Sequence, residues 1–529
     1  MSGSPATLDQ LDEEIRNAQY REAADTFCRL VVEENVPIRD GVAAAVRAAA
    51  PFVQVPSHLM RKPNGELRGV NYDHTILGWR GAVALMSYLP KRQAVLPAVQ
   101  AMWYVPQGLN IWEQLLCEFP GHYARDAEKC GSRLGPPEEE HDRFDGPAWT
   151  PPKIYFADHA PILEGSVDDR LDRLTWAIAE GDRDQSYALF VGLSQDPANR
   201  ERLKEAALFS GIIDLQDTLI NHGGYQNIGH KALRARALCD LADYLGWDNA
   251  HEVIYTVVPD LGCAPRLHGL WTEIQMITKV ELPNITKISK RSDMPMTELE
   301  MDRLTEVLLW GGPHEVNMTI TELFRRGAGI LDISDGIAVC YQRYLTDVLD
   351  HPNAFGNPMH AFDYLNVVNT WIRHYENPHQ AKAVYMAARF VNDAIRYNAM
   401  FPRDPSVELP RPAEYRRLAE NIATDRLLPA LGEAILAQEA PLAMSVVNSY
   451  LERTAERSDL LTTITYASSH FQNDPHIMRN CTSSIEEWTN NQTSRRDDIL
   501  RGWVKHQSRY IKRARAQECF ELYSQYFRP

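Results

Sequence analysis

Three segments of the chain place an asparagine three residues before a histidine, and an apolar, helix-like run follows each of them. They are NYDH at 71–74, NIGH at 227–230 and NPMH at 357–360. Neutral imidazole is the commonest metal ligand in proteins. The helix dipole disfavours a protonated histidine near a helix N-terminus, so these positions favour the neutral ring. Three histidines at equivalent places in related units could therefore meet at one metal ion.

A fourth unit offers a carboxylate at the matching place. VVNSYLER at 446–453 matches VVNTWIRH at 367–374, and carrying that match back seven residues puts Glu439 where His360 stands. Three histidines and one carboxylate suit Fe(II), and also manganese or zinc, with open positions for water, substrate or dioxygen. The sequence thus predicts a metal site made by His74, His230, His360 and Glu439.

An alternative interpretation of the same motif needs no metal. Asparagine is a favoured N-cap residue, because its side chain accepts a hydrogen bond from a backbone N–H two or three positions on. Asn71, Asn227 and Asn357 would then begin helices, with each histidine at the third helical position. Capping leaves the histidine itself unexplained, since glutamate or glutamine is favoured at that position. Both interpretations remain open at this point.

Other side chains could contribute to the same site. His222 precedes the histidine of NIGH by eight residues, beside a pair of glycines, and could act as an acid or base next to the metal; the alternative is an ordinary turn histidine. Asp363 would share a helix face with His360, as a ligand or an orienting carboxylate. His58 and His314 lie outside the repeated pattern and are further candidates.

The elements that position these residues are helices almost throughout. Apolar residues recur every three or four positions, as in HKALRARALCDLADYLG, and alternating β-type runs are rare. Three stretches rich in proline, charge and turn formers interrupt the pattern, at 131–152, 281–296 and 401–412. We therefore expect an all-α fold, a pseudo-symmetric array of about four helical repeat modules packed around a shared central site.

These interruptions divide a single all-α assembly into four modules. Their expected bounds are 1–130, 153–282, 297–400 and, for a divergent fourth copy, 413–529. DRLT occurs at 172–175 and again at 302–305, and each copy begins 58 residues before its histidine, which gives a period of 130 residues. Units of that length suit larger helical bundles better than short solenoid repeats.

Composition excludes several classes of function. The net charge of −16 argues against a general nucleic-acid binder and against an anionic membrane surface as partner. The eight cysteines include no CxxC pair, which indicates reduced intracellular thiols. The polar N-terminal residues lack the apolar core of a signal peptide, and no apolar run is long enough to span a membrane, so we expect a cytoplasmic protein. GxGxxG, GxxxxGK[ST], GxSxG and HExxH are absent, which leaves nucleotide-cofactor and serine-hydrolase chemistry without support.

Two segments resemble the questin oxidase-like family of helical oxygenases. They are GHKALRARALCDLADYLGWDNAHEVI at 229–254 and MHAFDYLNVVNTWIRHYENPHQAKAVYMAARFV at 359–391, and the resemblance extends over roughly residues 60–400. It implies a non-heme iron enzyme of secondary metabolism that uses dioxygen on polyketide-derived anthraquinones. Iron in such members is held mainly by histidines, in one case with a carboxylated lysine. By position, His74, His230 and His360 match the family's histidine-opened helices. The segment EAPLAMSVVN in the fourth module contains no lysine, so Glu439 would take the place of a carboxylated-lysine ligand.

The expected function is that of a metal-dependent oxygenase, with iron as the metal, acting with dioxygen on an aromatic or polyketide-like small molecule. The expected partners are that substrate and dioxygen, with no nucleic acid and no membrane. Two alternatives remain: a non-catalytic helical-repeat interaction protein whose histidines are structural, and a metal-dependent lyase or hydrolase that does no redox chemistry.

Overall fold

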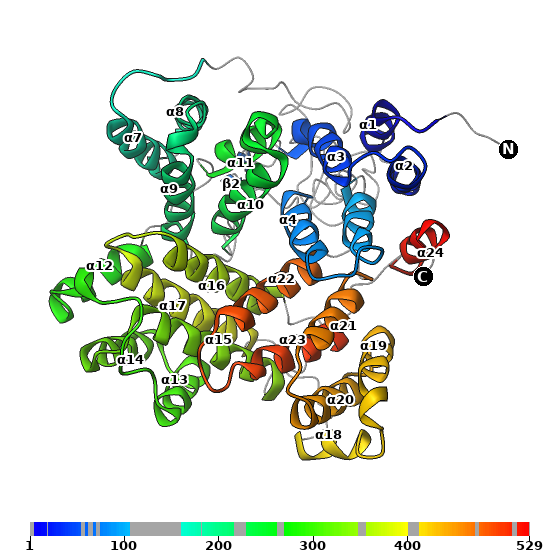
Figure 1. Cartoon of the computed structure of the whole chain (residues 1–529). Coiled ribbons are helices and arrows are strands. Elements are labelled where there is room, and N and C mark those ends of the chain that lie inside the picture. Colours follow the sequence, from blue (N-terminus) through cyan, green and yellow to red (C-terminus); the bar gives the residue numbers. More distant parts are fainter. Residues whose placement is uncertain are drawn as a thin grey trace.

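The computed structural model shows an all-α fold, as the helical periodicity predicts (Figure 1). The described part also contains a short antiparallel hairpin, in which β1 (Leu59–Arg61) pairs with β2 (Leu67–Gly69). No helix in this part is long and apolar enough to cross a membrane. The structure describes residues 5–17, 19–53, 59–61, 67–69, 75–105, 160–180, 182–215, 229–261, 269–347, 356–399, 412–470, 475–509 and 516–527.

The helices form four groups in chain order. The first group contains α1 (Leu8–Arg16), α2 (Tyr20–Val32), α3 (Ile38–Val53), α4 (Thr75–Met86) and the helical residues 95–105. The second group contains α7 (Val167–Glu180), α8 (Arg183–Ser194), α9 (Arg200–Ile213), α10 (His230–Leu245) and α11 (His251–Leu261). The third group contains α13 (Glu298–Trp310), α14 (Pro313–Arg326), α15 (Ile330–Asp347), α16 (Gly356–His374) and α17 (Gln380–Ala399). The fourth group contains α19 (Leu427–Ala437), α20 (Ala440–Arg453), α21 (Ser458–Ser468), α22 (Pro475–Asn490) and α23 (Asp497–Arg509).

Three further helices connect or flank these groups: α12 (Gly269–Glu281), α18 (Pro412–Leu418) and α24 (Ala516–Tyr526). The predicted loop at 281–296 does lie between α12 and α13 and contains one 3₁₀ turn, Ile285–Lys287. The predicted loops at 131–152 and 401–411 lie outside the described residues. α12 falls within the predicted module 153–282, yet it packs on α17 of the third group.

Local sequence explains where many helices begin and end. At the start of α13, the Thr297 side chain accepts from the backbone of Glu300 while the Glu300 carboxylate accepts from the backbone of Thr297, a capping box. α14 begins with Pro313 at its first position, where no N–H is needed, and ends at Gly327 with φ of 101°. These signals fix helix ends independently of the tertiary packing.

The same packing order recurs in the second, third and fourth groups. In each of these groups the first helix packs on the second and the third, and the second helix packs on the fifth. The fourth helix packs on both the third and the fifth. The first three helices of the third group begin 131, 130 and 130 residues after their counterparts in the second. The interpretation of these groups as copies of one repeat module stays a prediction.

One helix from each group contributes to a closed central ring. α4 packs on α10, α10 on α16, α16 on α22, and α22 back on α4. Figure 1 shows the four groups following one another around these helices. Ring helices are buried on nearly every side, which is why the sequence of α4, TILGWRGAVALM, is apolar almost all round. We call α4, α10, α16 and α22 the central ring.

The last described helix joins the two ends of this arrangement. α24 packs on α2 in the first group, and the Tyr526 hydroxyl donates to the Asp25 carboxylate at 2.7 Å. The hydroxyl of Tyr523 on the same helix donates to the carbonyl of Arg92 at 3.0 Å. The C-terminal helix therefore lies beside the first group, which also meets the fourth group where α4 packs on α22 (Figure 1).

Gly211 allows α9 to approach the ring helix α10 closely. A Cβ atom at this position would lie 2.8 Å from the Cα and 2.9 Å from the backbone nitrogen of Ala232. Because the obstructing atoms are backbone, Gly211→Ala is expected to push the two helices apart and to lower the free energy of unfolding by about 1–3 kcal/mol. Urea denaturation measures this difference.

Gly432→Ala provides the matched control. A Cβ at Gly432 in α19 would make ordinary contact, 3.7 Å from a Thr463 methyl group. Alanine is the better helix former by about 1 kcal/mol, so this variant is expected to be at least as stable as the wild type. Equal midpoints for the two variants would contradict the close approach at Gly211.

Candidate metal centre

The central ring brings two of the predicted histidines into direct contact. His230 is the first residue of α10, and His360 lies near the start of α16. Their Nε2 atoms are 3.1 Å apart, and the two side chains are 3% and 4% exposed. The rings meet edge to face, with centroids 4.8 Å apart and an interplanar angle of 84°. Two residues 130 positions apart in sequence thus share one buried point.

A third histidine, which the sequence analysis missed, joins this pair. His476 is the second residue of α22, and its ring centroid lies 4.9 Å from that of His360 at an interplanar angle of 68°. His476 ends the tetrapeptide NDPH at 473–476, which has the same Asn–His spacing as the three motifs recognised before. This fourth motif was the signal that could have identified it.

The structure does not place Glu439 at this centre, so that part of the prediction is wrong. Glu439 is exposed and precedes the first residue of α20, which packs on α18, α19 and α23. The physical reason is a mistaken correspondence between helices. VVNSYLER belongs to α20, the second helix of its group, whereas VVNTWIRH belongs to α16, the fourth helix of its group. The counterpart of α16 is α22, which begins with Pro475 and His476.

The capping interpretation is also wrong in its details. α10 begins at His230 itself, its N-cap is Gly229, and no side chain caps it. α16 begins at Gly356, so His360 is its fifth residue rather than its third. Neither histidine is therefore at the third helical position that the capping interpretation requires. Asn71 and Asn227 lie outside the described residues.

The remaining predicted residues divide between described and undescribed parts of the chain. His74 immediately precedes α4, the first-group member of the central ring, but lies outside the described residues, as do His58 and His222. His314 is exposed at the start of α14, outside the central ring. Asp363 is fully buried one turn after His360 and accepts hydrogen bonds from Arg479 and from Asn480, the latter at 3.0 Å. Asp363 therefore links two ring helices.

The separation of 3.1 Å between the two Nε2 atoms is compatible with two kinds of chemistry. A neutral imidazole could donate its N–H to the other ring. Two nitrogens that bind one ion at 2.0–2.1 Å, at angles between the octahedral and tetrahedral values, stand about 2.8–3.4 Å apart. The His230–His360 pair therefore fits two adjacent ligands of one metal. Within the described ranges, no group of three or more His, Cys, Asp or Glu side chains is placed to hold a metal ion.

The start of α10 is seated tightly against the third group. Gly229 has φ of 84°, a left-handed conformation that glycine adopts readily. A Cβ there would lie 3.1 Å from the Phe390 ring and 3.2 Å from the Cβ of Tyr364. The Tyr364 hydroxyl donates to the carbonyl of Ile212 at 2.7 Å. These contacts fix where His230 enters the ring.

Charged side chains beside the histidines are buried in pairs. Lys231, the residue after His230, lies 2.6 Å from the Asp214 carboxylate, with the side chains 1% and 0% exposed. Burial, together with the nearby Asp214 carboxylate, raises the pKa of Tyr364 well above its ordinary value. Burial of an ion pair is costly unless its geometry is good, so the Lys231–Asp214 pair constrains how the helices around it meet.

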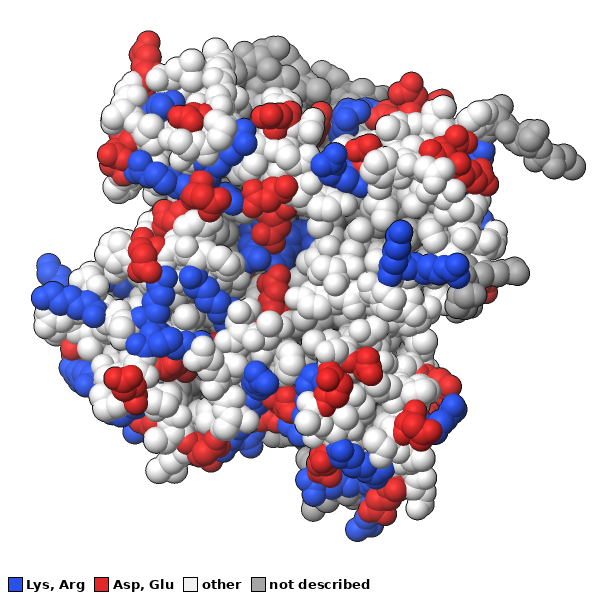
Figure 2. Space-filling view, viewed as in Figure 1, with Lys and Arg blue, Asp and Glu red and all other residues white. Residues whose placement is uncertain are grey.

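Further along the ring helices a second polar network connects three of them. Arg80 on α4 donates to Asp240 on α10 at 2.9 Å and to Glu486 on α22 at 2.8 Å. Burial alone would raise the pKa of Asp240, but the guanidinium groups of Arg236 and Arg80 hold it below its ordinary value. Figure 2 shows blue side chains at the floor of a hollow and red ones at its rim, where Figure 1 places α4, α10 and α22.

His470, six residues before His476, makes the stability of this region depend on pH. Burial lowers the pKa of His470 to about 4 from an ordinary 6.5. The centroid of its ring lies 4.0 Å from the centroid of the Phe520 ring. The unfolded chain therefore binds a proton at higher pH than the folded one, and stability is lost as pH falls from 6.5 to 4. Between pH 7 and 4.5 this histidine is expected to account for a loss of about 2–3 kcal/mol.

His470→Leu tests that expectation against the exposed His314→Leu. Urea unfolding at several pH values should show a smaller acid-induced loss in His470→Leu than in the wild type. His314→Leu should follow the wild type. Parallel profiles for all three proteins would contradict a buried, neutral His470.

Comparison with models of known protein families, with curated proteins and with solved structures finds no match to this chain.

Proposed function

We propose that this protein is a metal-dependent oxygenase, with iron at a centre held by histidines of the central ring. His230 and His360 would supply two adjacent ligands, and His74 a further one from the position before α4. His476 would join them by turning its ring when metal binds, since the three described histidines are not already placed around one ion. The observation that carries the proposal is the 3.1 Å separation of the His230 and His360 Nε2 atoms at the starts of two ring helices. Iron with open coordination positions would bind and activate dioxygen.

The protein's own contribution would be to hold these imidazoles neutral and in one orientation. The rings of His230 and His360 lie at or near the starts of their helices, where the helix dipole opposes protonation and so favours the neutral form that binds metal. The Asp363–Arg479 pair joins α16 to α22 three residues after each of their histidines, and would keep those two rings in register. His222 remains the proposed acid or base beside the centre.

The substrate class rests on the resemblance between residues 229–254, 359–391 and the questin oxidase-like family. We propose an aromatic, polyketide-derived small molecule as substrate, dioxygen as co-substrate and the cytoplasm as location.

The test combines metal content with oxygen consumption. The full-length protein, purified without a metal-binding tag, should contain near-stoichiometric iron, or take it up anaerobically. With a hydroxyanthraquinone as probe it should then consume oxygen, and chelated protein should not. Bound metal without oxygen consumption over a panel of aromatic polyketides would favour the lyase or hydrolase alternative. Failure to bind iron, manganese or zinc would overturn the metal centre.

A second candidate is a non-catalytic helical protein with structural histidines. The same 3.1 Å distance also suits an imidazole–imidazole hydrogen bond, which is the observation that favours the second candidate. The two candidates differ in how the protein responds when both histidines are replaced. If the pair is structural, the double variant His230→Asn/His360→Asn would still form a hydrogen bond and fold. Added metal would then change the melting temperature of neither the wild type nor the double variant.

A further inference from the structure

A cavity of about 660 Å³ lies away from the histidine centre, between the second and third groups. Its walls come from α7, α9, α12 and the turn at 375–379 that connects α16 to α17. Its volume is in the range of small-molecule sites. His230, His360 and His476 are not among its lining residues. Any ligand of this cavity would therefore bind independently of the proposed metal centre.

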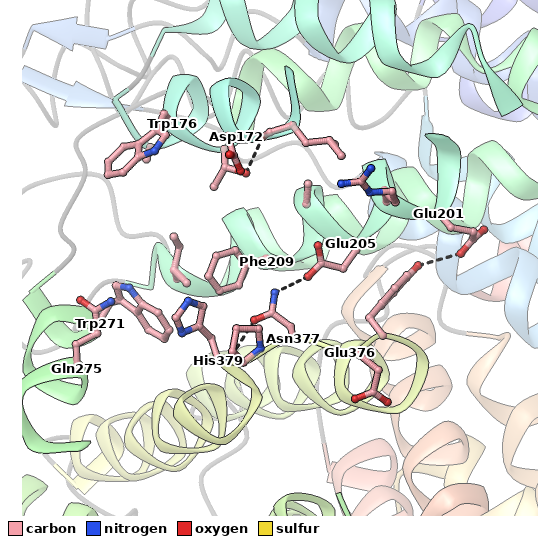
Figure 3. Close-up of a pocket in the computed structure, with 18 residues that line it drawn as sticks. Asp172, Trp176, Glu201, Glu205, Phe209, Trp271, Gln275, Glu376, Asn377 and His379 are labelled. Carbon is pink, nitrogen blue, oxygen red and sulfur yellow. Dashed lines mark hydrogen bonds between the residues drawn. The ribbon is translucent and has the colours of Figure 1, made fainter. Parts of the chain in front are cut away.

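Aromatic rings form one end of the cavity. Phe209 stacks on His379 with centroids 5.5 Å apart and an interplanar angle of 10°, and Trp271 meets His379 edge to face at 5.6 Å. Figure 3 shows these three rings grouped together, with Trp176 facing them across the cavity from α7. Trp176 is 67% exposed, so its ring is available for contact with a ligand. A tryptophan left that exposed on a cavity wall is a common feature of binding sites.

Carboxylates outnumber cations around the same cavity. Glu205 on α9 accepts from Asn377 at 2.8 Å (Figure 3). It also accepts from the Trp371 indole at 3.2 Å, and both donors are neutral. Burial raises the pKa of Glu205, although these two hydrogen bonds act in the opposite direction. Asp172 also lines the cavity and is exposed. A cationic ligand group would compensate both carboxylates.

The other charged groups at the cavity are already paired. Glu201 lies 2.5 Å from Lys204, and Glu376 lies 2.7 Å from Lys290. Among the described lining residues, the only guanidinium is that of Arg202, which pairs with Asp168 and also acts electrostatically on Glu205. One cation already lies at the edge of the aromatic wall, since the ammonium of Lys382 is 5.9 Å from the Trp271 ring centroid and 3.2 Å from His379 Nδ1. Burial lowers the pKa of Lys382 below its ordinary value.

We propose that this cavity binds a small organic ammonium ion, a protonated or quaternary amine with an apolar body. Its charged head would lie against Glu205 and the electron-rich faces of the aromatic rings, and its apolar part would lie toward Trp176. Aromatic walls favour an organic cation over a metal ion, which would require several oxygen ligands. The carboxylates favour it over an anion of similar shape.

Benzyltrimethylammonium is a suitable probe, with benzyl alcohol as a neutral and phenylacetate as an anionic counterpart. Isothermal titration of the full-length protein should show saturable 1:1 binding of the ammonium ion, about tenfold or more tighter than either counterpart. Trp176→Ala and Glu205→Gln should each weaken binding by about fivefold or more. Because Trp176 is exposed, its substitution leaves the core intact.

Trp310→Ala is the matched control, since Trp310 is 69% exposed on α13 and does not line the cavity. Binding to this variant should equal that of the wild type. The proposal is overturned if the ammonium ion does not saturate the protein, if benzyl alcohol or phenylacetate binds as tightly, or if Trp176→Ala and Glu205→Gln bind like the wild type.

Discussion

His476→Ala is expected to reduce the metal content of the purified protein by about tenfold or more, because loss of a direct ligand should cost at least as much affinity as loss of an outer hydrogen-bond partner. His476 lies with its ring 4.9 Å from that of His360, on the ring helix that the fourth NxxH motif begins. Elemental analysis gives metal per chain. The melting temperature with and without added Fe(II) gives the linked stabilisation.

Glu439→Ala distinguishes His476 as the metal ligand of the fourth group from Glu439, the ligand predicted by sequence matching. Glu439 is exposed at the start of α20, so its replacement should leave metal content and melting temperature unchanged. His314→Ala removes an exposed histidine and controls for adventitious surface binding. Loss of metal in Glu439→Ala but not in His476→Ala would restore the carboxylate ligand and contradict the structure.

Arg479→Met is expected to lower the free energy of unfolding by about 3–5 kcal/mol, the usual cost of removing one partner of a buried ion pair. Arg479 is about 1% exposed and Asp363 is fully buried, and the guanidinium Nε donates to the carboxylate. After the substitution, Asn480 would remain as the donor to Asp363, and a neutral amide compensates a buried charge only in part. Chemical denaturation with two optical probes measures the loss.

The double variant Arg479→Met/Asp363→Leu tests the cause of that loss. With both charges removed, stability should recover much of the way to the wild-type value, because an apolar pair leaves no buried charge uncompensated. Arg16→Met is the matched control, since Arg16 pairs with Asp12 at 2.6 Å on the surface helix α1, and exposed pairs contribute about 0–1 kcal/mol. Equal losses in Arg479→Met and Arg16→Met would mean that burial does not govern this pair.

The sequence predicts the elements of this fold better than their meeting points. Helical periodicity is a local property, so the all-α class and the loop at 281–296 follow from it directly. The pairing of His230 with His360 also followed, because both open the fourth helix of their group. The position of each histidine within its helix did not, since Gly229 rather than an asparagine is the N-cap of α10.

Glu439 illustrates why the fourth ligand position was assigned to the wrong helix. The match between VVNSYLER and VVNTWIRH compares two apolar helix segments, and such segments resemble one another wherever a helix is buried. Only the packing order distinguishes α20 from α22. Contacts such as Asp363 with Arg479, 116 residues apart, depend on closure of the central ring and leave no trace in local sequence.

The closure of the central ring has a mechanical consequence. A ring has no end at which a misfit can be absorbed, so a shift of one helix alters its crossings with two neighbours at once. At the crossing of α4 with α22, a Cβ on Gly81 would lie only 3.1 Å from the backbone nitrogen of Arg479, so there is little slack to take up such a shift. Strain introduced in any one quarter of the molecule would therefore be shared by all four, and the geometry at the histidines is a collective property of the entire chain.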